Sequence, residues 1–142
     1  MIGKLQTNKV KFVIPLFDYI HSLDSIKLAK KISEEQVKKN KKLKIFIQVN
    51  IGNEGQKSGI NAAELKDFYQ LCVRDLDLDI IGLMCLPPKD NDSSEYFIEM
   101  KKLAENIKII NLSMGMSNDY SKAAENGATF LRIGSKIFGK RD

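Results

Sequence analysis

The sequence contains no long apolar run, only two cysteines and only one histidine. A membrane-spanning helix needs about 18 or more consecutive apolar residues, so no such helix is predicted. Cys72 and Cys85 are too few for a disulfide framework, and the apolar segments around them predict buried, reduced thiols. The sequence has no metal-ligand clustering, and no serine or cysteine is placed to use His21 as a base. His21 is therefore expected to be a hydrogen-bonded residue at a strand end, not a catalyst.

The amino terminus also lacks the signals that direct a chain out of the cell. Its first nine residues, MIGKLQTNK, contain neither an apolar signal-peptide core nor a small-residue cleavage site. Together with the reduced cysteines, this predicts a cytoplasmic protein. The length of 142 residues, with 43% apolar and 29% charged residues, suits one globular domain or a piece of a larger one.

Arginine is scarce: lysine supplies 20 of the 23 basic residues, and the net charge is +5. Eight of these lysines lie between Lys27 and Lys44, mostly on a predicted helix. Nucleic-acid-binding faces usually combine arginine with aromatic residues, and this segment has no arginine. The pattern favours a solvated helix face over the alternative, an RNA-binding patch.

Apolar segments with strand composition alternate with amphipathic helical segments along the whole chain. Strands are predicted at 17–21, 44–50, 79–86, 109–113 and 129–133, with a fragment of a sixth strand at 2–6. Helices are predicted between successive strands and at 135–138. No linker or change of composition divides the sequence. The pattern predicts a single α/β domain with a parallel sheet covered by helices.

The last two predicted strands, 109–113 and 129–133, each end in a turn rich in glycine, serine and methionine that opens a helix. Backbone N–H groups at such a strand-to-helix turn point toward bound anions. Two such turns in tandem resemble the phosphate-binding end of a (β/α)8 barrel. The sequence therefore predicts a phosphate site built from both turns.

Six motifs, in order and together spanning the whole chain, carry a family resemblance. They are IGKLQTNK at 2–9, IHSLD at 20–24, IQVNIGNEGQKSGI at 47–60, IGLMCLP at 81–87, LSMGMSND at 112–119 and RIGSKIFGKRD at 132–142. Together they closely resemble the YggS/PROSC-type pyridoxal-phosphate-binding proteins, which share the barrel fold of the alanine racemase N-terminal domain. The resemblance implies an incomplete (β/α)8 TIM barrel with about six of eight βα units, forming one partial domain over 1–142.

The resemblance also implies the cofactor and the function. We expect the chain to hold pyridoxal 5'-phosphate (PLP) at the carboxyl ends of its strands and to act in PLP homeostasis without catalysis. Family members carry the lysine that forms the Schiff base on a strand near their start, and this sequence begins at the equivalent of the third strand. We therefore expect non-covalent PLP binding by this chain.

The resemblance assigns the phosphate to the two turns. Ser117, which follows Met116, supplies a hydroxyl and nearby amides in the first turn. Gly134 allows close approach of the backbone in the second turn, and Ser135 adds a second hydroxyl. From the residues alone, Ser117 could instead cap the helix near Asp119, and the second turn could be a plain strand end.

The resemblance places four further residues around the cofactor ring. Arg132 would donate to the pyridine nitrogen and so keep the ring from becoming a pyridinium; alternatively, it pairs with a carboxylate. Asn50 is a candidate donor, and Met84 is a candidate to pack beneath the ring. Lys57 is either a secondary acceptor for the cofactor or an ordinary solvated loop residue.

The alternative function is that of a fragment of a PLP-dependent amino-acid racemase or decarboxylase. Alanine racemase needs a second, β-rich domain that supplies a tyrosine base, and this sequence contains no such domain. Among partners, we expect the small-molecule cofactor, no membrane and no nucleic acid. An incomplete barrel leaves two open sheet edges, so we also expect self-association.

Overall fold

The computed structural model describes residues 1–55, 58–88 and 92–139, and in them five strands form a single parallel sheet. The strands are β1 (Tyr19–Leu23), β2 (Lys44–Val49), β3 (Asp79–Cys85), β4 (Asn111–Met116) and β5 (Phe130–Arg132). They lie side by side in chain order, and each neighbouring pair is parallel. This order without reversal is that of a barrel wall, and the predicted fold class, an incomplete α/β barrel, is confirmed.

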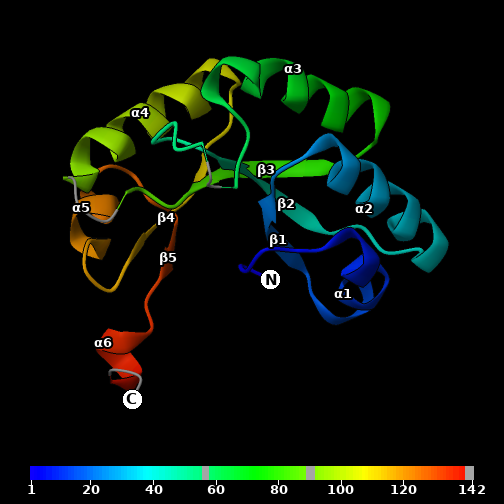
Figure 1. Cartoon of the computed structure of the whole chain (residues 1–142), viewed down its shortest axis with the longest axis horizontal. Helices are drawn as coiled ribbons and strands as arrows, with labels where there is room; N and C mark the ends of the chain where they lie inside the picture. The colour runs from blue at the N-terminus through cyan, green and yellow to red at the C-terminus, as the bar shows by residue number, and fades with distance from the viewer. Residues whose placement is uncertain (56–57, 89–91, 140–142) are drawn as a thin grey trace.

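Helices connect the strands, and α2, α3 and α4 lie along one side of the sheet (Figure 1). The helical elements are η1 (Thr7–Lys9), α1 (Val10–Leu16), α2 (Ile26–Lys39), η2 (Ala62–Glu64), α3 (Leu65–Gln70), the π-helical turn η3 (Leu71–Asp75), α4 (Ser93–Asn106), α5 (Tyr120–Glu125) and α6 (Ser135–Phe138). Side-chain caps start three of them: Ser25 accepts from the Leu28 amide, Asn61 from Ala63 and Asp92 from Ser94.

The two faces of the sheet have different chemistry because successive side chains of a strand point to opposite faces. The face under the helices is apolar and joins the main core through Ile45, Ile47, Leu83, Cys85, Leu112 and Met114. The opposite face, which is the inner face of the barrel wall, carries aromatic and polar side chains. On it, the ring of His21 stacks on Phe46 with centroids 4.3 Å apart, and Phe130 meets Phe46 edge-on at 5.0 Å.

The predicted strand fragment at 2–6 does not form, so the described sheet has five strands instead of about six. Met1 alone continues the hydrogen bonding beyond β1. Its ammonium group donates to the Tyr19 carbonyl at 2.8 Å, and its carbonyl accepts from the His21 amide at 2.9 Å. The chain then turns away into η1, whose buried neighbour Val10 enters the core.

Two other strands begin and end later than predicted. β1 is predicted at 17–21 and lies at Tyr19–Leu23, while β4 is predicted at 109–113 and lies at Asn111–Met116. The β4 prediction stopped at Ser113, because Gly115 was assigned to a turn. Gly115 instead stays within the strand with a φ of 90°, and a Cβ there would lie 2.5 Å from that of Ala123. Met116 therefore lies at the end of β4 and not in the turn after it.

The last helix is set apart from the other helices. α6 lies beyond the end of β5 (Figure 1), and its apolar residues Ile137 and Phe138 are 67% and 86% exposed. In the described sheet, β1 and β5 are the edge strands. In the part of the chain that the structure describes, no helix is long and apolar enough to span a bilayer.

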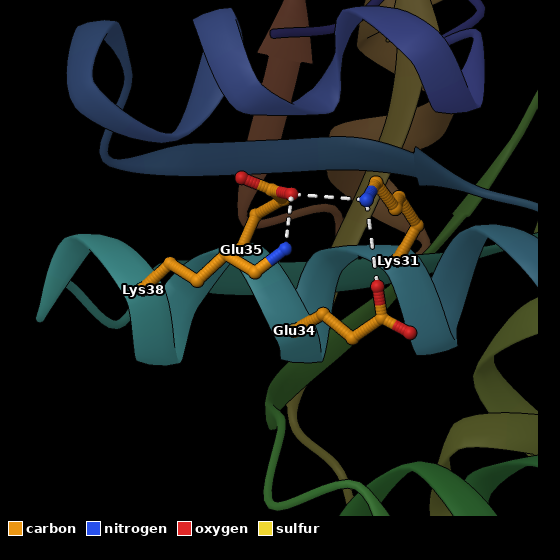
Figure 2. Close-up of polar contacts among 4 residues, drawn as sticks. All are labelled: Lys31, Glu34, Glu35 and Lys38. Carbon is orange, nitrogen blue, oxygen red and sulfur yellow. Dashed lines mark hydrogen bonds and ion pairs between the residues drawn. The ribbon is translucent and has the colours of Figure 1, made fainter.

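Two of the five lysines on helix α2, Lys31 and Lys38, form ion pairs with glutamates of the same helix. Figure 2 shows Glu35 between Lys31 and Lys38, at 2.9 Å and 3.3 Å, with Lys31 also 3.4 Å from Glu34. These contacts lower the pKa of the Glu35 carboxyl, with the hydrogen bond from Lys31 as the largest cause. Pairing within the helix reduces the charge that these two lysines could offer to a polyanion, and the lysines at 27, 30 and 39 are exposed to solvent, in keeping with the prediction of a solvated helix face.

Candidate functional site

The turns after β4 and β5 meet at one atom, the hydroxyl oxygen of Ser117. The backbone amide of Gly134 donates to this oxygen at 3.2 Å, and the amide of Lys136 donates to it at 3.4 Å. Ser117 is 8% exposed, whereas Gly134 and Ser135 lie open to solvent. Two amides of the turn after β5 thus meet the side-chain oxygen of the turn after β4, although the two turns are distant in sequence.

Ser117 does not cap the helix that follows it. Helix α5 begins after Asp119, whose carboxylate accepts from the Met116 amide at 2.7 Å and so closes its own turn. The Ser117 hydroxyl instead binds amides at the start of α6, where Gly134 has no side chain to cap the helix. The two amides are therefore held together by an oxygen from the neighbouring turn.

Arg132 lies two residues before the second turn and reaches across the sheet from β5 to β3. Its Nη1 donates to Ser113 Oγ of β4 at 2.7 Å, and its Nη2 donates to the Cys85 carbonyl of β3 at 2.8 Å. Among the described residues, none of the ion pairs within 4.0 Å involves Arg132. The alternative that Arg132 pairs with a carboxylate is therefore not seen in this part of the chain.

Ser113 links Arg132 to the single histidine. The Ser113 side chain is fully buried, and its hydroxyl lies 2.8 Å from Nδ1 of His21 on β1. The His21 ring is itself held between aromatic rings, stacked on Phe46 and edge-on to Phe130 at a centroid distance of 5.6 Å. Side chains from β1, β4 and β5 thus form one polar line across the inner face.

The ionisation states in this line follow from burial. Burial, helped by the amino-terminal ammonium and by Arg132, lowers the pKa of His21 to about 4, so its imidazole is neutral near pH 7. Burial also lowers the pKa of Arg132, but a guanidinium remains protonated in proteins. Burial raises the pKa of the Cys85 thiol to about 12, so that thiol is not a nucleophile at neutral pH. Arg132 is therefore the cation of this group.

The structure brings most of the predicted site residues to one edge of the sheet. Met116 pairs in register with Arg132 and is 39% exposed at the end of β4. Met84 is buried in β3, directly opposite Ser113 of β4. With Ser117, Gly134 and Ser135, these residues lie at the carboxyl ends of β3, β4 and β5, where ligands of parallel α/β folds bind.

One predicted residue, Asn50, is not brought into this group, and a second, Lys57, lies outside the part of the chain that the structure describes. Asn50 follows β2, and its side chain is used by its own loop: Nδ2 donates to the Glu54 carbonyl at 2.9 Å, and Oδ1 accepts from the Glu54 amide at 3.3 Å. The predicted cofactor contacts of Asn50 and Lys57 stay predictions.

The sequence interpretation missed Ser113 as a partner of both Arg132 and His21. The expectation that no serine is placed beside His21 was wrong, because Ser113 Oγ lies 2.8 Å from its Nδ1. A signal was present, because each is a polar residue in an otherwise apolar predicted strand. Such a residue must find a hydrogen-bond partner when it is buried. Which partner it finds depends on the register between strands, and the sequence does not specify that.

A parallel barrel wall whose last two turns meet at its carboxyl edge is the feature to compare with known proteins. The model of the family "Alanine racemase, N-terminal domain" matches residues 2–142. The pyridoxal phosphate homeostasis protein of Aquifex aeolicus is 38% identical to this chain over 99% of it, and the match covers 65% of that protein. The chain thus spans about two thirds of the length of this relative.

Solved structures agree with the family match. The structure of PipY from Synechococcus elongatus without PLP superimposes with a TM-score of 0.90 at 30% identity, covering 96% of this chain and 68% of PipY. The PipY structure with PLP bound gives a TM-score of 0.87 at 29% identity over the same shares. The chain belongs to the alanine racemase N-terminal domain family, in the group that includes PipY.

A more distant likeness concerns the fold alone. The arginine decarboxylase of Paramecium bursaria Chlorella virus superimposes with a TM-score of 0.67 at 16% identity, covering 94% of this chain and 44% of the decarboxylase. Enzymes and homeostasis proteins therefore share this barrel wall, so the fold by itself does not decide between them.

Proposed function

We propose that this chain binds PLP without a covalent bond and serves PLP homeostasis, not catalysis. The observation that carries the proposal is the meeting of the two turns: amides of Gly134 and Lys136 converge on the Ser117 oxygen. A phosphate oxygen is an acceptor of the same kind with a larger negative charge, and several such donors bind it well. PipY, with which this chain shares its family, has been solved with PLP bound.

The residues present fit this cofactor at both of its ends. Ser117, Gly134 and Ser135 offer hydroxyl and amide donors for the phosphate. Within the described residues, no carboxylate oxygen accepts from either amide that meets Ser117. Arg132 offers a permanent cation, fixed by two neutral partners, for the ring nitrogen. Met84, buried beside Ser113, supplies an apolar surface for the ring.

The proposed role as a binder and not an enzyme rests on the chemistry that Arg132 permits. PLP supplies an aldehyde that reacts with amines and a ring that withdraws electrons, most strongly when its nitrogen is protonated. An arginine can only donate to that nitrogen, so it disfavours the protonated ring. His21 is neutral and hydrogen-bonded to Ser113, which leaves its Nδ1 without a role as a free base.

Binding should depend on the phosphate group. We expect PLP to bind about tenfold or more tightly than pyridoxal, which lacks the phosphate, and inorganic phosphate to compete with PLP. Fluorescence titration of the purified chain measures both. Equal affinity for pyridoxal and PLP, or no competition by phosphate, would overturn the assignment of the two turns.

The non-covalent part of the proposal has a separate test. Borohydride treatment of the chain with PLP, followed by peptide mass spectrometry, identifies any lysine bonded to the cofactor. We expect scattered, low-level labelling among the lysines. A single fully labelled lysine, Lys57 among the candidates, would show instead that this chain supplies its own covalent anchor.

The alternative, a fragment of a PLP-dependent racemase or decarboxylase, is favoured only by the fold shared with the arginine decarboxylase. Both reactions act at the α-carbon of an amino acid. NMR of amino acids in D2O with the chain and PLP would detect loss of the α-proton signal. We expect no loss beyond that caused by PLP alone, and a loss that depends on the chain would favour the alternative.

The predicted cytoplasmic location of the protein stays a prediction.

A further inference from the structure

Resting on the proposed function, a further inference concerns the residues behind Arg132. We propose that Ser113 and His21 are positioning residues, forming a directional relay that fixes the Arg132 guanidinium for the ring nitrogen of PLP. The relay runs across three strands, from His21 on β1 through Ser113 on β4 to Arg132 on β5.

The direction of the relay follows from donors and acceptors. A guanidinium has no acceptor, so the 2.7 Å contact makes Ser113 Oγ the acceptor of Arg132 Nη1–H. The hydroxyl has one proton left to place, and it is fully buried. Among the described residues its only other partner is His21 Nδ1, at 2.8 Å. Ser113 therefore donates to Nδ1, which must be unprotonated, and the imidazole proton sits on Nε2.

The opposite arrangement is disfavoured. If Nδ1 carried the proton, the Ser113 oxygen would accept from both His21 and Arg132, and its own buried proton would lack an acceptor. An unsatisfied buried donor is destabilising, because it has lost its hydrogen bonds to water without replacement. A doubly protonated imidazole would also place a second positive charge beside the guanidinium, at the same inner face.

The aromatic packing fixes the other end of the relay. The His21 ring lies nearly parallel to Phe46, at an interplanar angle of 20°, and Phe130 meets it at 72°. Phe46 in turn packs on Gly82, where a Cβ would lie 2.5 Å from the ring. Because the imidazole cannot turn freely between these rings, Nδ1 stays directed at Ser113. Ser113 therefore keeps its lone pairs toward Arg132.

Neutral partners also preserve the charge of Arg132. A carboxylate in place of Ser113 would hold the guanidinium firmly, but it would also compete with the ring nitrogen for the cation. The hydroxyl of Ser113 and the carbonyl of Cys85 hold two of its nitrogens without opposing its charge. The relay thus fixes the orientation of the Arg132 guanidinium and leaves its positive charge unpaired by these two partners.

Matched substitutions test the relay through PLP affinity. Ser113→Ala removes the hydroxyl and Ser113→Thr keeps it; His21→Phe keeps an aromatic ring on Phe46 and removes Nδ1. We expect Ser113→Ala and His21→Phe each to weaken PLP binding about fivefold, and Ser113→Thr to retain most of it. Because both act through one hydroxyl, the double variant Ser113→Ala/His21→Phe should lose little more than either single variant.

A measurement without cofactor tests the same relay in the unsubstituted chain. The 15N chemical shifts of the His21 ring distinguish its tautomers, and we expect an unprotonated Nδ1 and a protonated Nε2 at pH 7. A proton on Nδ1 would overturn the direction of the relay whether or not PLP binds, and it needs no variant to fold.

The outcomes separate the inference from the proposed function. If Arg132→Gln lowers PLP affinity while Ser113→Ala and His21→Phe leave it within twofold, PLP binding stands and the relay is wrong. If PLP does not bind the unsubstituted chain, the proposed function fails, and the 15N shifts still decide the hydrogen-bond direction. Equal losses for Ser113→Thr and Ser113→Ala would point to packing at this position and overturn the role of the hydroxyl.

Discussion

Ser117 and Gly134, 17 residues apart, are joined by a 3.2 Å hydrogen bond in which the Gly134 amide donates to the Ser117 hydroxyl. The bond ties the turn after β4 to the turn after β5. It gives the amides at the start of α6 an acceptor that Gly134, which has no side chain, cannot provide. In the proposed function the phosphate binds at the same two turns. The Ser117 hydroxyl would therefore both join the turns and donate to the phosphate.

Removing that hydroxyl should weaken PLP binding. We expect Ser117→Ala to lower PLP affinity about tenfold, because it removes one donor and leaves two amides without their shared acceptor. Isothermal titration calorimetry measures the change. Ser121→Ala, an exposed position on the neighbouring helix α5, is the matched control and should leave affinity unchanged. An unchanged affinity for Ser117→Ala would remove this residue from the site.

His21 should make stability fall in mild acid. Its pKa is about 4 when folded and 6.5 ordinarily, so the unfolded chain takes up a proton between these values and the folded chain does not. The free energy of unfolding therefore rises with pH across this window, and acidification from pH 6.5 to 4 should cost about 1–2 kcal/mol at this residue.

Urea unfolding at several pH values, with His21→Phe as reference, isolates this effect from the titration of carboxyl groups. Burial is the first cause of the pKa shift, and the amino-terminal ammonium and Arg132 add to it. His21→Phe should have a flatter profile between pH 6.5 and 5. Identical profiles for the two proteins would mean that His21 titrates normally in the folded chain.

Gly82 should not tolerate a side chain. A Cβ there would lie 2.4 Å from the Asn111 carbonyl oxygen and 2.5 Å from the Phe46 ring. Because backbone cannot move as easily as a flexible side chain, Gly82→Ala should lower the free energy of unfolding by about 1–3 kcal/mol. Gly3→Ala is the control, since a Cβ at Gly3 has no atom within 4 Å. Equal unfolding midpoints in urea for the two variants would contradict the packing described for the inner face.

The open end of the sheet should drive self-association of the isolated chain. β5 is an edge strand, and next to it Phe138 and Ile137 of α6 are largely exposed. We expect light scattering to find oligomers whose fraction rises with concentration, and Phe138→Lys to reduce it. Val37→Lys, 80% exposed on α2, is the control and should leave association unchanged. A concentration-independent monomer would contradict this prediction.

Much of the fold could be predicted because the hydrophobic pattern separates strands from helices, and the family resemblance implied a barrel. Alternating apolar strands and amphipathic helices specify a parallel sheet, and the five strands lie where the pattern places them, within a few residues. The fragment at 2–6 was wrong because a short apolar segment resembles a strand whether or not it finds a full partner. The end of β4 was missed because Gly115 was taken as a turn and not as a strand residue with positive φ.

The site also has a part that could be predicted from the sequence and a part that could not. Ser117 and the turn at Gly134 could be placed together because parallel strands end at one edge. The contacts between Arg132, Ser113 and His21 could not, because they depend on register across β1, β4 and β5. Register follows from packing over the whole sheet, and a single strand sequence does not contain it.

The structure of the chain crystallised with PLP tests the central claim most directly. We expect the phosphate to lie against Ser117 and the amides of the Gly134–Lys136 turn, with the ring nitrogen facing Arg132. A phosphate bound elsewhere, for example among the lysines of α2, or a ring turned away from Arg132, would contradict it.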